Sequence, residues 1–270
     1  MNFTVLMSLY IKENASYLND CLKSLENQTM PANEIVIVLD GPISIELENV
    51  LFKWEQQLPI KKIPLEKNIG LGRALNIGLK HCSNEWVFRM DTDDICLPSR
   101  FEVQVEYIQK HPETVLLGGQ IKEFSTTPTE DMFTRKVPIG FKNIYNYAIK
   151  KNPFNHMTVA YKKSNILQLG GYQHHLFMED YNLWLRVLAN HKKVENLPNT
   201  LVLVRAGDAM LSRRRGKIYI KSEWEMFKLK KSLGYHGWTK GILLFVARAL
   251  PRILPPQLLT KIYRLQRKIE

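Results

Sequence analysis

Residues 90–104 read MDTDDICLPSRFEVQ, and they place a dense group of acids directly after a buried apolar run. The run at residues 86–90, WVFRM, has the length and composition of a buried strand. Three carboxylates then fall within four residues, at Asp91, Asp93 and Asp94. A protein tolerates such repulsion at a strand end only where a cation or several hydrogen-bond donors compensate it.

Alternate side chains of an extended segment point the same way, so Asp91 and Asp93 can share one target. A hard divalent cation, Mn²⁺ or Mg²⁺, suits two such carboxylates and usually keeps open positions for substrate phosphates. The pattern therefore predicts a metal that neutralises a diphosphate leaving group. The alternative is an exposed acidic turn in which Asp94 caps the helix that follows Pro98.

Strand and helix patterns alternate on both sides of the acidic stretch. Apolar runs predict strands at residues 3–9, 34–39, 60–65 and 86–90, and helical spacing predicts helices at 14–27, 45–57, 71–81 and 98–110. Repeated units of this length predict an α/β protein, with a parallel sheet covered by helices and ligands bound at the carboxyl ends of the strands.

The pattern becomes less regular after residue 112. We expect strands at 115–124, with a bulge at Gly118-Gly119, at 157–161 and at 194–204, and helices at 180–189, 217–231, 238–250 and 257–268. The predicted organisation is a catalytic domain at residues 1–210, made of a regular half at 1–110 and a less regular half at 111–210. A basic amphipathic helical extension follows at 211–270.

Charge is distributed unevenly along the 270 residues. Residues 1–200 carry 22 Lys/Arg and 22 Asp/Glu, whereas residues 201–270 carry 16 Lys/Arg and 4 Asp/Glu, so the entire net charge of +12 lies in the last 70 residues. Such asymmetry favours an anionic partner for that end, although a solvated helical face is the simpler alternative. Three widely spaced cysteines match no metal or disulfide pattern, which favours a reducing compartment.

The chain shows no secretory signal at its start and no apolar stretch of 18 residues. We therefore expect a cytoplasmic protein, peripheral on the inner face of the plasma membrane. Apolar and basic residues mix over residues 238–268, as in helices that lie on anionic bilayers. A helix that packs on the catalytic domain or on a partner subunit is the alternative.

Five sequence blocks follow one another in a fixed order within residues 3–205. They are SLYIKENASYLNDCLKSLENQ at 8–28, IVIVLDGP at 35–42, NIGLGRALNIGL at 68–79, MDTDDICLPSRFEVQ at 90–104 and MEDYNLWLRV at 178–187. Together they resemble family 2 inverting glycosyltransferases of the GT-A fold, of the type that builds bacterial surface polysaccharides. The resemblance implies a Rossmann-like, mostly parallel sheet that binds a nucleotide sugar. It also implies that residues 1–110 form a nucleotide-binding half and residues 111–210 an acceptor-binding half.

The resemblance also implies roles for individual residues on the donor side. Asp40 would hydrogen-bond the uracil edge, Asp91 would lie near the ribose and the metal, and Asp93 would ligate the metal. The sequence departs from the family here, because a single Asp precedes Gly41-Pro42 in place of the usual D-D-G-S. The implied donor-binding set comprises Ser8, Tyr10, Asp40, Asn68, Gly70, Arg73, Asp91 and Arg213, with Arg205, Arg214 and Arg215 as alternatives for the phosphate contact.

On the acceptor side, the resemblance implies that Asp180 is the general base that takes the proton from the acceptor hydroxyl. Glu179 is its neighbour, and their repulsion would raise one pKa toward the operating range. Both acids also suit the first turn of a helix, where the dipole favours negative charge. His156 is a weaker candidate for the acceptor site, Trp184 is expected in the core, and His174-His175 in an exposed loop.

The function implied is transfer of a hexose or N-acetylhexosamine from a UDP-sugar to a hydroxyl of a glycan acceptor, lipid-linked, in O-antigen, capsule or lipooligosaccharide synthesis. Two other classes compete with it. A nucleotidyltransferase acting on sugar phosphates would need a glycine-rich phosphate loop after the first strand, and residues 8–16, SLYIKENAS, contain no glycine. A nucleic-acid-binding module would fit the basic end, but no stacking motif or fold signature supports it, so we expect no nucleic-acid partner.

Overall fold

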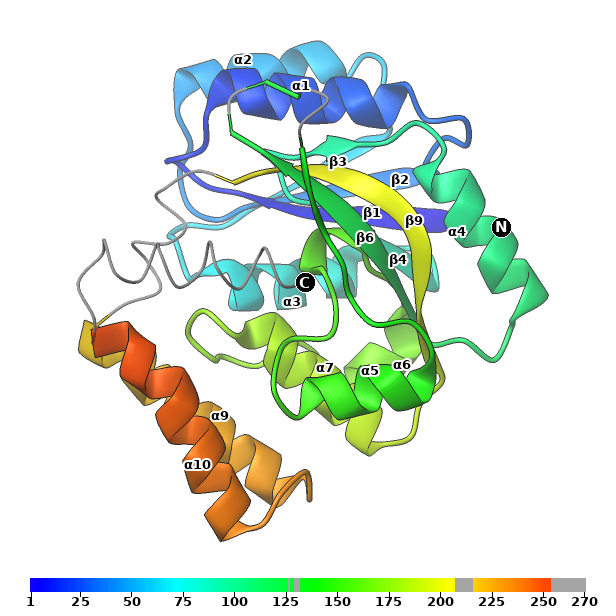
Figure 1. Ribbon diagram of the computed structural model, residues 1–270. Helices are drawn as coiled ribbons and strands as arrows, with labels where there is room; N and C mark the ends of the chain where they lie inside the picture. The colour runs from blue at the N-terminus through cyan, green and yellow to red at the C-terminus, as the bar shows by residue number, and fades with distance from the viewer. Residues whose placement is uncertain (126, 129–131, 207–215, 254–270) are drawn as a thin grey trace.

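The structure is a computed structural model that describes residues 1–125, 127–128, 132–206 and 216–253. Within these residues a mixed sheet is covered on both faces by helices, which confirms the predicted α/β class (Figure 1). The strands follow one another across the sheet in the order β3-β2-β1-β4-β8-β6-β9-β5, and β7 pairs with β6 off this path.

The first four strands form the parallel part of the sheet. They are β1 (Phe3–Leu9), β2 (Glu34–Leu39), β3 (Ile60–Pro64) and β4 (Trp86–Arg89), and α1 (Ala15–Glu26), α2 (Ile45–Trp54) and α3 (Leu71–His81) connect them. The pairs β1–β2, β1–β4 and β2–β3 are all parallel. Nearly every residue of β1, β2 and β4 is buried, as a sheet covered on both faces requires. Their carboxyl ends therefore meet at one edge.

The second part of the sheet contains antiparallel pairs that the repeating strand–helix pattern did not predict. β8 (Ala160–Lys162) lies antiparallel between β4 and β6 (Leu116–Phe124), whereas β6 runs parallel to the long β9 (Val194–Arg205). The β6–β9 register shifts on either side of Gln120, which confirms the predicted irregularity there. The other elements of this half are β5 (Ile95–Cys96), β7 (Phe133–Arg135), α4 (Arg100–Lys110), α5 (Phe141–Ala148), η1 (His156–Thr158), α6 (Lys163–Gln168) and α7 (Glu179–Ala189).

Several predicted boundaries were wrong. The helix predicted at 45–57 ends at Trp54, and the strand predicted at 157–161 begins as the 3-10 helix η1 before β8. The reason for the second error is local, because the N–H and the hydroxyl of Thr158 both donate to the carbonyl of Asn155, at 2.9 and 2.8 Å, and close a turn. The strands β5 and β7 and the helices α5 and α6 were not predicted. The helix predicted at 257–268 lies outside the described residues.

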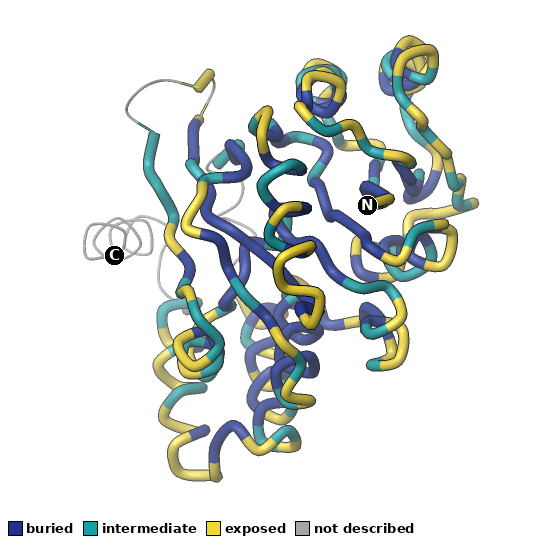
Figure 2. The backbone as a smooth tube through the Cα atoms, turned by 90° about the vertical axis from the view of Figure 1, so that its right-hand side faces the viewer, coloured by how far each residue is buried: buried dark blue, intermediate teal, exposed yellow. Residues whose placement is uncertain are grey.

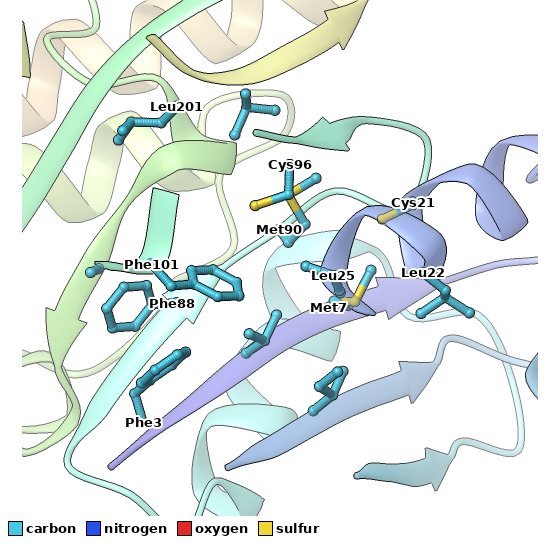
Figure 3. Close-up of a cluster of buried hydrophobic side chains, with 14 of the residues drawn as sticks. Phe3, Met7, Cys21, Leu22, Leu25, Phe88, Met90, Cys96, Phe101 and Leu201 are labelled. Carbon is cyan, nitrogen blue, oxygen red and sulfur yellow. The ribbon is translucent and has the colours of Figure 1, made fainter. Parts of the chain in front are cut away.

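Two apolar cores hold the helices against the two faces of the sheet. Figure 2 shows the buried residues running through the interior of the molecule. On one face, the rings of Phe3 from β1, Phe88 from β4 and Phe101 from α4 pack at centroid distances of 4.4 to 5.5 Å (Figure 3). On the other face, Trp184 of α7 is fully buried, as predicted, and packs against Phe154 and Tyr161.

The C-terminal hairpin consists of α9 (Gly216–Ser232) and α10 (Trp238–Ala249), followed by η2 (Leu250–Ile253). It lies beside α7, away from the sheet (Figure 1). Glu223 of α9 is 2% exposed and pairs with Arg248 of α10, with Oε2 2.6 Å from Nε. Among the described residues, no helix combines the length and the apolar character that crossing a bilayer requires.

The packing of α3 on the sheet provides a test of the fold. A Cβ at Gly78 would lie 2.5 Å from Val38 Cγ2 and 2.6 Å from Leu6 Cδ1. Gly78→Val should therefore lower the free energy of unfolding by about 1–3 kcal/mol more than Lys80→Val does. Lys80 is exposed on the same helix, so it controls for the helix propensity of valine. Equal effects in urea unfolding would show that this contact is not tight.

Candidate active site

A cavity of about 640 Å³ opens at the carboxyl edge of the parallel strands. This is the place where α/β sheets bind ligands, and the volume suits a small molecule. Seven residues of the predicted site line it: Ser8, Tyr10, Asp40, Asn68, Gly70, Asp91 and Asp93. Arg73 is exposed on α3 and does not belong to this lining, and Arg213 to Arg215 lie outside the described residues.

The acidic loop after β4 is a turn rather than the extended segment we expected, yet its exposure alternates. Asp91 and Asp93 are half-buried, whereas Thr92 and Asp94 are buried. Beneath the loop, Arg89 is 1% exposed and places Nη1 2.5 Å from Asp91 Oδ1. Burial, with the negative charges of Asp91 and Glu13, raises the pKa of Asp93 to about 7. The loop therefore holds more negative charge than Arg89 compensates.

The prediction that Asp94 caps a helix was wrong. Its Oδ1 accepts the backbone N–H of Arg205 at 3.0 Å, which ties the loop to the end of β9. The Arg205 side chain reinforces this tie, because Nε donates to the carbonyl of Asp93 at 3.0 Å and Nη2 pairs with Asp20 at 2.8 Å. Its guanidinium lies 4.0 Å from the ring centroid of Tyr17. Arg205 thus holds the acidic loop at the rim of the cavity.

Asp40 is 4% exposed and organises the loop that precedes α3. Its carboxylate accepts the Ile69 N–H at 2.7 Å, the Asn68 Nδ2 at 3.0 Å and the Gly70 N–H at 3.1 Å. Gly41 has a φ of +88°, and a Cβ there would lie 2.6 Å from the Asn68 nitrogen, so only glycine allows this close approach. The predicted contact of Asp40 with uracil stays a prediction, and the structure adds this role in shaping the loop.

Sequence reasoning missed several cavity residues on the loop after β1 and in the first turn of α1. Lys12, Glu13 and Tyr17 all line the cavity. Glu13 Oε2 accepts the hydroxyl of Thr92 at 2.8 Å, so this loop is joined to the acidic loop. The only signal in the sequence was their position after the carboxyl end of β1, which does not identify which side chains turn inward.

The acids predicted as acceptor-side residues lie at the start of α7 and not in the lining of this cavity. Glu179 packs on the first turn of α3, because a Cβ at Gly72 would lie 2.9 Å from its Cβ. Burial, then the charge of Asp180, raises the pKa of Glu179 to about 7, and Asp91 contributes in the same direction. The charge of the acidic loop therefore reaches Glu179 at the start of α7.

His156 lies in η1 and places Nε2 2.9 Å from the hydroxyl of Tyr172. Burial and the charge of Arg89 lower the pKa of His156 well below its ordinary value, so its ring is neutral. The expectation of an exposed His174-His175 loop was half wrong. His174 is exposed, but His175 is 3% exposed and its Nε2 lies 2.9 Å from the Ser222 carbonyl of α9.

The acidic loop has carboxylates that could bind a metal ion. Among residues that the structure describes, no group of three His, Cys, Asp or Glu side chains is arranged to hold a metal ion by itself. Two half-buried carboxylates, Asp91 and Asp93, suit a hard cation that takes its other ligands from water and a diphosphate. Burial, and then the charges of Asp91 and Glu13, raise the pKa of Asp93, and a bound cation would oppose that rise. The residues present therefore fit Mg²⁺ or Mn²⁺.

Glu179 provides a test of these electrostatics. A carboxyl with an ordinary pKa of 4.5 and a folded pKa of about 7 stabilises the fold below pH 4.5, and this contribution is lost as the pH rises through 7. Glu179→Gln should therefore flatten the decline of the free energy of unfolding between pH 4.5 and 8. Glu48→Gln, at an exposed position of α2, is the control. Parallel pH curves for wild type and Glu179→Gln would contradict the assignment.

Comparison with known proteins places this geometry in a family. Residues 4–168 match the model of the family described as glycosyl transferase family 2. The chain is 47% identical to the amylovoran biosynthesis glycosyltransferase AmsE of Erwinia amylovora, over 98% of this chain and 99% of that protein. It is 35% identical to a UDP-Gal:alpha-D-GlcNAc-diphosphoundecaprenol beta-1,3-galactosyltransferase of Escherichia coli, over 97% of this chain and 95% of that protein.

Solved structures agree on the fold. S. aureus TarS 1-349 in complex with UDP-GlcNAc superposes with a TM-score of 0.68 at 19% identity, covering 93% of this chain and 72% of that one. The chain spans 43% of the longer TarS structure. Mannosyltransferase PcManGT of Pyrobaculum calidifontis, in complex with GDP-Man and Mn²⁺, gives a TM-score of 0.63 at 15% identity and coverages of 98% and 80%. The fold is thus GT-A, and the chain belongs to glycosyl transferase family 2.

Proposed function

We propose that this glycosyltransferase moves a hexose or N-acetylhexosamine from a UDP-sugar to a hydroxyl of a lipid-linked glycan, with inversion at the anomeric carbon. The pathway would be synthesis of O-antigen, capsule or lipooligosaccharide. The observation that carries the proposal is the acidic loop at the rim of the 640 Å³ cavity. The E. coli relative, whose name gives a UDP-sugar donor and a diphosphoundecaprenol-linked acceptor, supports the donor and acceptor classes.

On the donor side, the loops after β1, β2, β3 and β4 would surround the nucleotide. Ser8 and Tyr10 offer hydroxyls, and the loop fixed by Asp40 presents Asn68 and Gly70 to the same cavity. Asp91 and Asp93 would hold Mn²⁺ or Mg²⁺, which supplies positive charge to the diphosphate when bound. Arg205 keeps the loop in place through the Asp93 carbonyl, so these carboxylates need little rearrangement when the donor arrives.

On the acceptor side, Asp180 would act as the general base. The acceptor hydroxyl gives its proton to the carboxylate as its oxygen bonds to the anomeric carbon, and the bond from that carbon to the UDP oxygen breaks. Attack opposite the leaving group inverts the anomer. Glu179 adjoins the base, and its raised pKa keeps it largely protonated below pH 7, which limits the repulsion between the two acids.

The nucleotidyltransferase alternative is weaker. That chemistry places a glycine-rich phosphate loop directly after the first strand, and the loop after β1 carries Lys12, Glu13 and Asn14 instead. The carboxylate of Glu13 accepts a hydrogen bond from the hydroxyl of Thr92, so the loop after β1 supports the acidic loop. Family membership also favours glycosyl transfer.

Two substitutions separate the halves of the proposed mechanism. Asp180→Asn should retain the affinity for UDP and lower sugar transfer by about 10²–10⁴-fold, because it removes the base. Asp93→Asn should instead weaken Mn²⁺-dependent UDP binding as well as transfer. Wild type is first screened with UDP-hexoses and UDP-N-acetylhexosamines, with Mn²⁺ and with chelator. If wild type turns over no UDP-sugar, the proposed donor class is wrong. If both variants lose UDP binding equally, the assignment of Asp180 as the base is wrong.

The C-terminal hairpin supports a proposed contact with an anionic membrane at the cytoplasmic face. Five exposed apolar residues follow one face of α10 and η2: Trp238, Ile242, Leu243, Val246 and Leu250. The adjoining α9 exposes Lys217, Lys221 and Lys228, and Lys231 Nζ lies 3.5 Å from the Trp238 ring centroid. Apolar residues bordered by lysines suit a bilayer with anionic headgroups, whereas two such surfaces would repel each other in a dimer.

The membrane contact is tested by placing charge in the apolar face. Leu243→Glu/Val246→Glu should weaken sedimentation with phosphatidylglycerol-containing vesicles by about ten-fold or more, because both side chains would leave the interface. Phe52→Glu, at a residue of α2 that is 69% exposed, is the control and should bind as wild type does. Unchanged binding of the double variant would exclude this face, and a dimer in light scattering would identify a second copy as the occupant.

A further inference from the structure

The C-terminal hairpin reaches the acceptor side through one short segment, residues 148–152, which we name the 148–152 turn. It begins at Ala148, the last residue of α5, and ends before η1. Lys230 of α9 donates from Nζ to the Ile149 carbonyl at 2.9 Å, and Arg248 of α10 donates from Nη1 to the Lys150 carbonyl at 2.7 Å. Two cationic side chains of the hairpin thus hold two successive carbonyls of this turn.

The other side of the 148–152 turn faces α7. Asn152 donates from Nδ2 to Oδ2 of Asp180 at 2.6 Å. The hydroxyl of Tyr181 donates back to the Ala148 carbonyl at 2.6 Å, so the turn and the start of α7 are joined in both directions. The turn therefore lies between the hairpin and the proposed base, and hydrogen bonds connect it to each.

The carboxylate of Asp180 is fixed at both oxygens. Asn152 donates to Oδ2, and the backbone N–H of Tyr181 donates to Oδ1 at 2.7 Å. Because these two donors reach different oxygens, they set the plane of the carboxylate. An amide donor is well suited to this task because it orients the carboxylate without adding a charge that would oppose proton uptake.

We propose that Asn152 is a positioning residue for the base Asp180, and that the C-terminal hairpin is part of the acceptor half because it holds the turn that carries Asn152. The inference rests on the proposed function, which assigns the base to Asp180. It extends that function to Asn152, Lys230 and Arg248, none of which any sequence block identified.

The cost of the buried groups in the hairpin supports this inference. Burial lowers the pKa of Lys230 to about 7, and Glu223 and Arg248 form a largely buried ion pair. Buried charges stabilise a fold poorly compared with apolar side chains of similar volume. Here both cations direct donors to backbone carbonyls of one turn, which gives them a specific structural role. An apolar hairpin could dock on α7 but could not bind these carbonyls.

Asn152→Ala tests the positioning role directly. The variant should lower kcat on the order of 10- to 100-fold, because a base misplaced by about 1 Å loses that much rate. The dissociation constant for UDP and the KM for the donor should stay within two-fold of wild type. Asn146→Ala, at an exposed asparagine of α5, is the matched control and should leave kcat unchanged. A kcat within two-fold of wild type, or a parallel loss of UDP affinity, would overturn the inference.

Lys230→Met tests the contribution of the hairpin without touching the base. It replaces a buried cation by an apolar side chain of similar length, so the fold should persist, which thermal unfolding checks. Hydrogen–deuterium exchange should become faster in residues 148–152 in this variant, and kcat should fall several-fold. Asn152→Ala should speed exchange at residues 179–182, whereas Asn146→Ala should not.

The exchange measurements also separate the two hypotheses. If wild type transfers no sugar from any UDP-sugar, the proposed function fails, and exchange alone decides whether the turn couples the hairpin to α7. If wild type is active but neither variant changes exchange or kcat, the function stands and the inference fails.

Discussion

The ion pair between Arg89 and Asp91 is the interaction on which the site depends. A guanidinium that is 1% exposed would be very costly alone, and the acids of the loop above it would repel one another without it. The charge of Arg89 also opposes the rise in the pKa of Asp93 and of Glu179, and it lowers the pKa of His156. One buried cation thus acts on the donor-side and acceptor-side residues together.

The backbone around this pair is fixed from several directions. Arg100, also 1% exposed, donates from Nη2 to the Arg89 carbonyl at 2.7 Å, and Cys21 of α1 donates to the Asp91 carbonyl at 3.2 Å. Arg205 closes the loop from the end of β9. Residues of α1, of α4 and of the end of β9 therefore all contact this turn. Its geometry depends on how these elements pack around the sheet.

The sequence predicted this arrangement in part, and the physical reasons are local. The first three strand–helix units have strong periodicity, and polar residues follow their strands. Their succession along the chain and the sheet edge that carries the site therefore followed from the pattern. β5 has two residues, and its pairing with β9 decides its conformation, so no pattern marked it. The burial of Arg89 and the bond from Asn152 to Asp180 arise between elements distant in sequence, which no spacing rule reveals.

The basic C-terminal region shows why net charge alone describes a partner poorly. Of its cations, Lys230, Arg248 and Arg205 bind carbonyls or carboxylates inside the molecule. What the hairpin presents outward is an apolar row on α10 beside lysines of α9. Attraction to anionic lipid would therefore come from a few exposed lysines. The exposed apolar area of α10 would determine how deeply the hairpin enters the bilayer surface. Because the same hairpin holds the 148–152 turn, a surface that docks on a membrane would be built into the acceptor half of the enzyme.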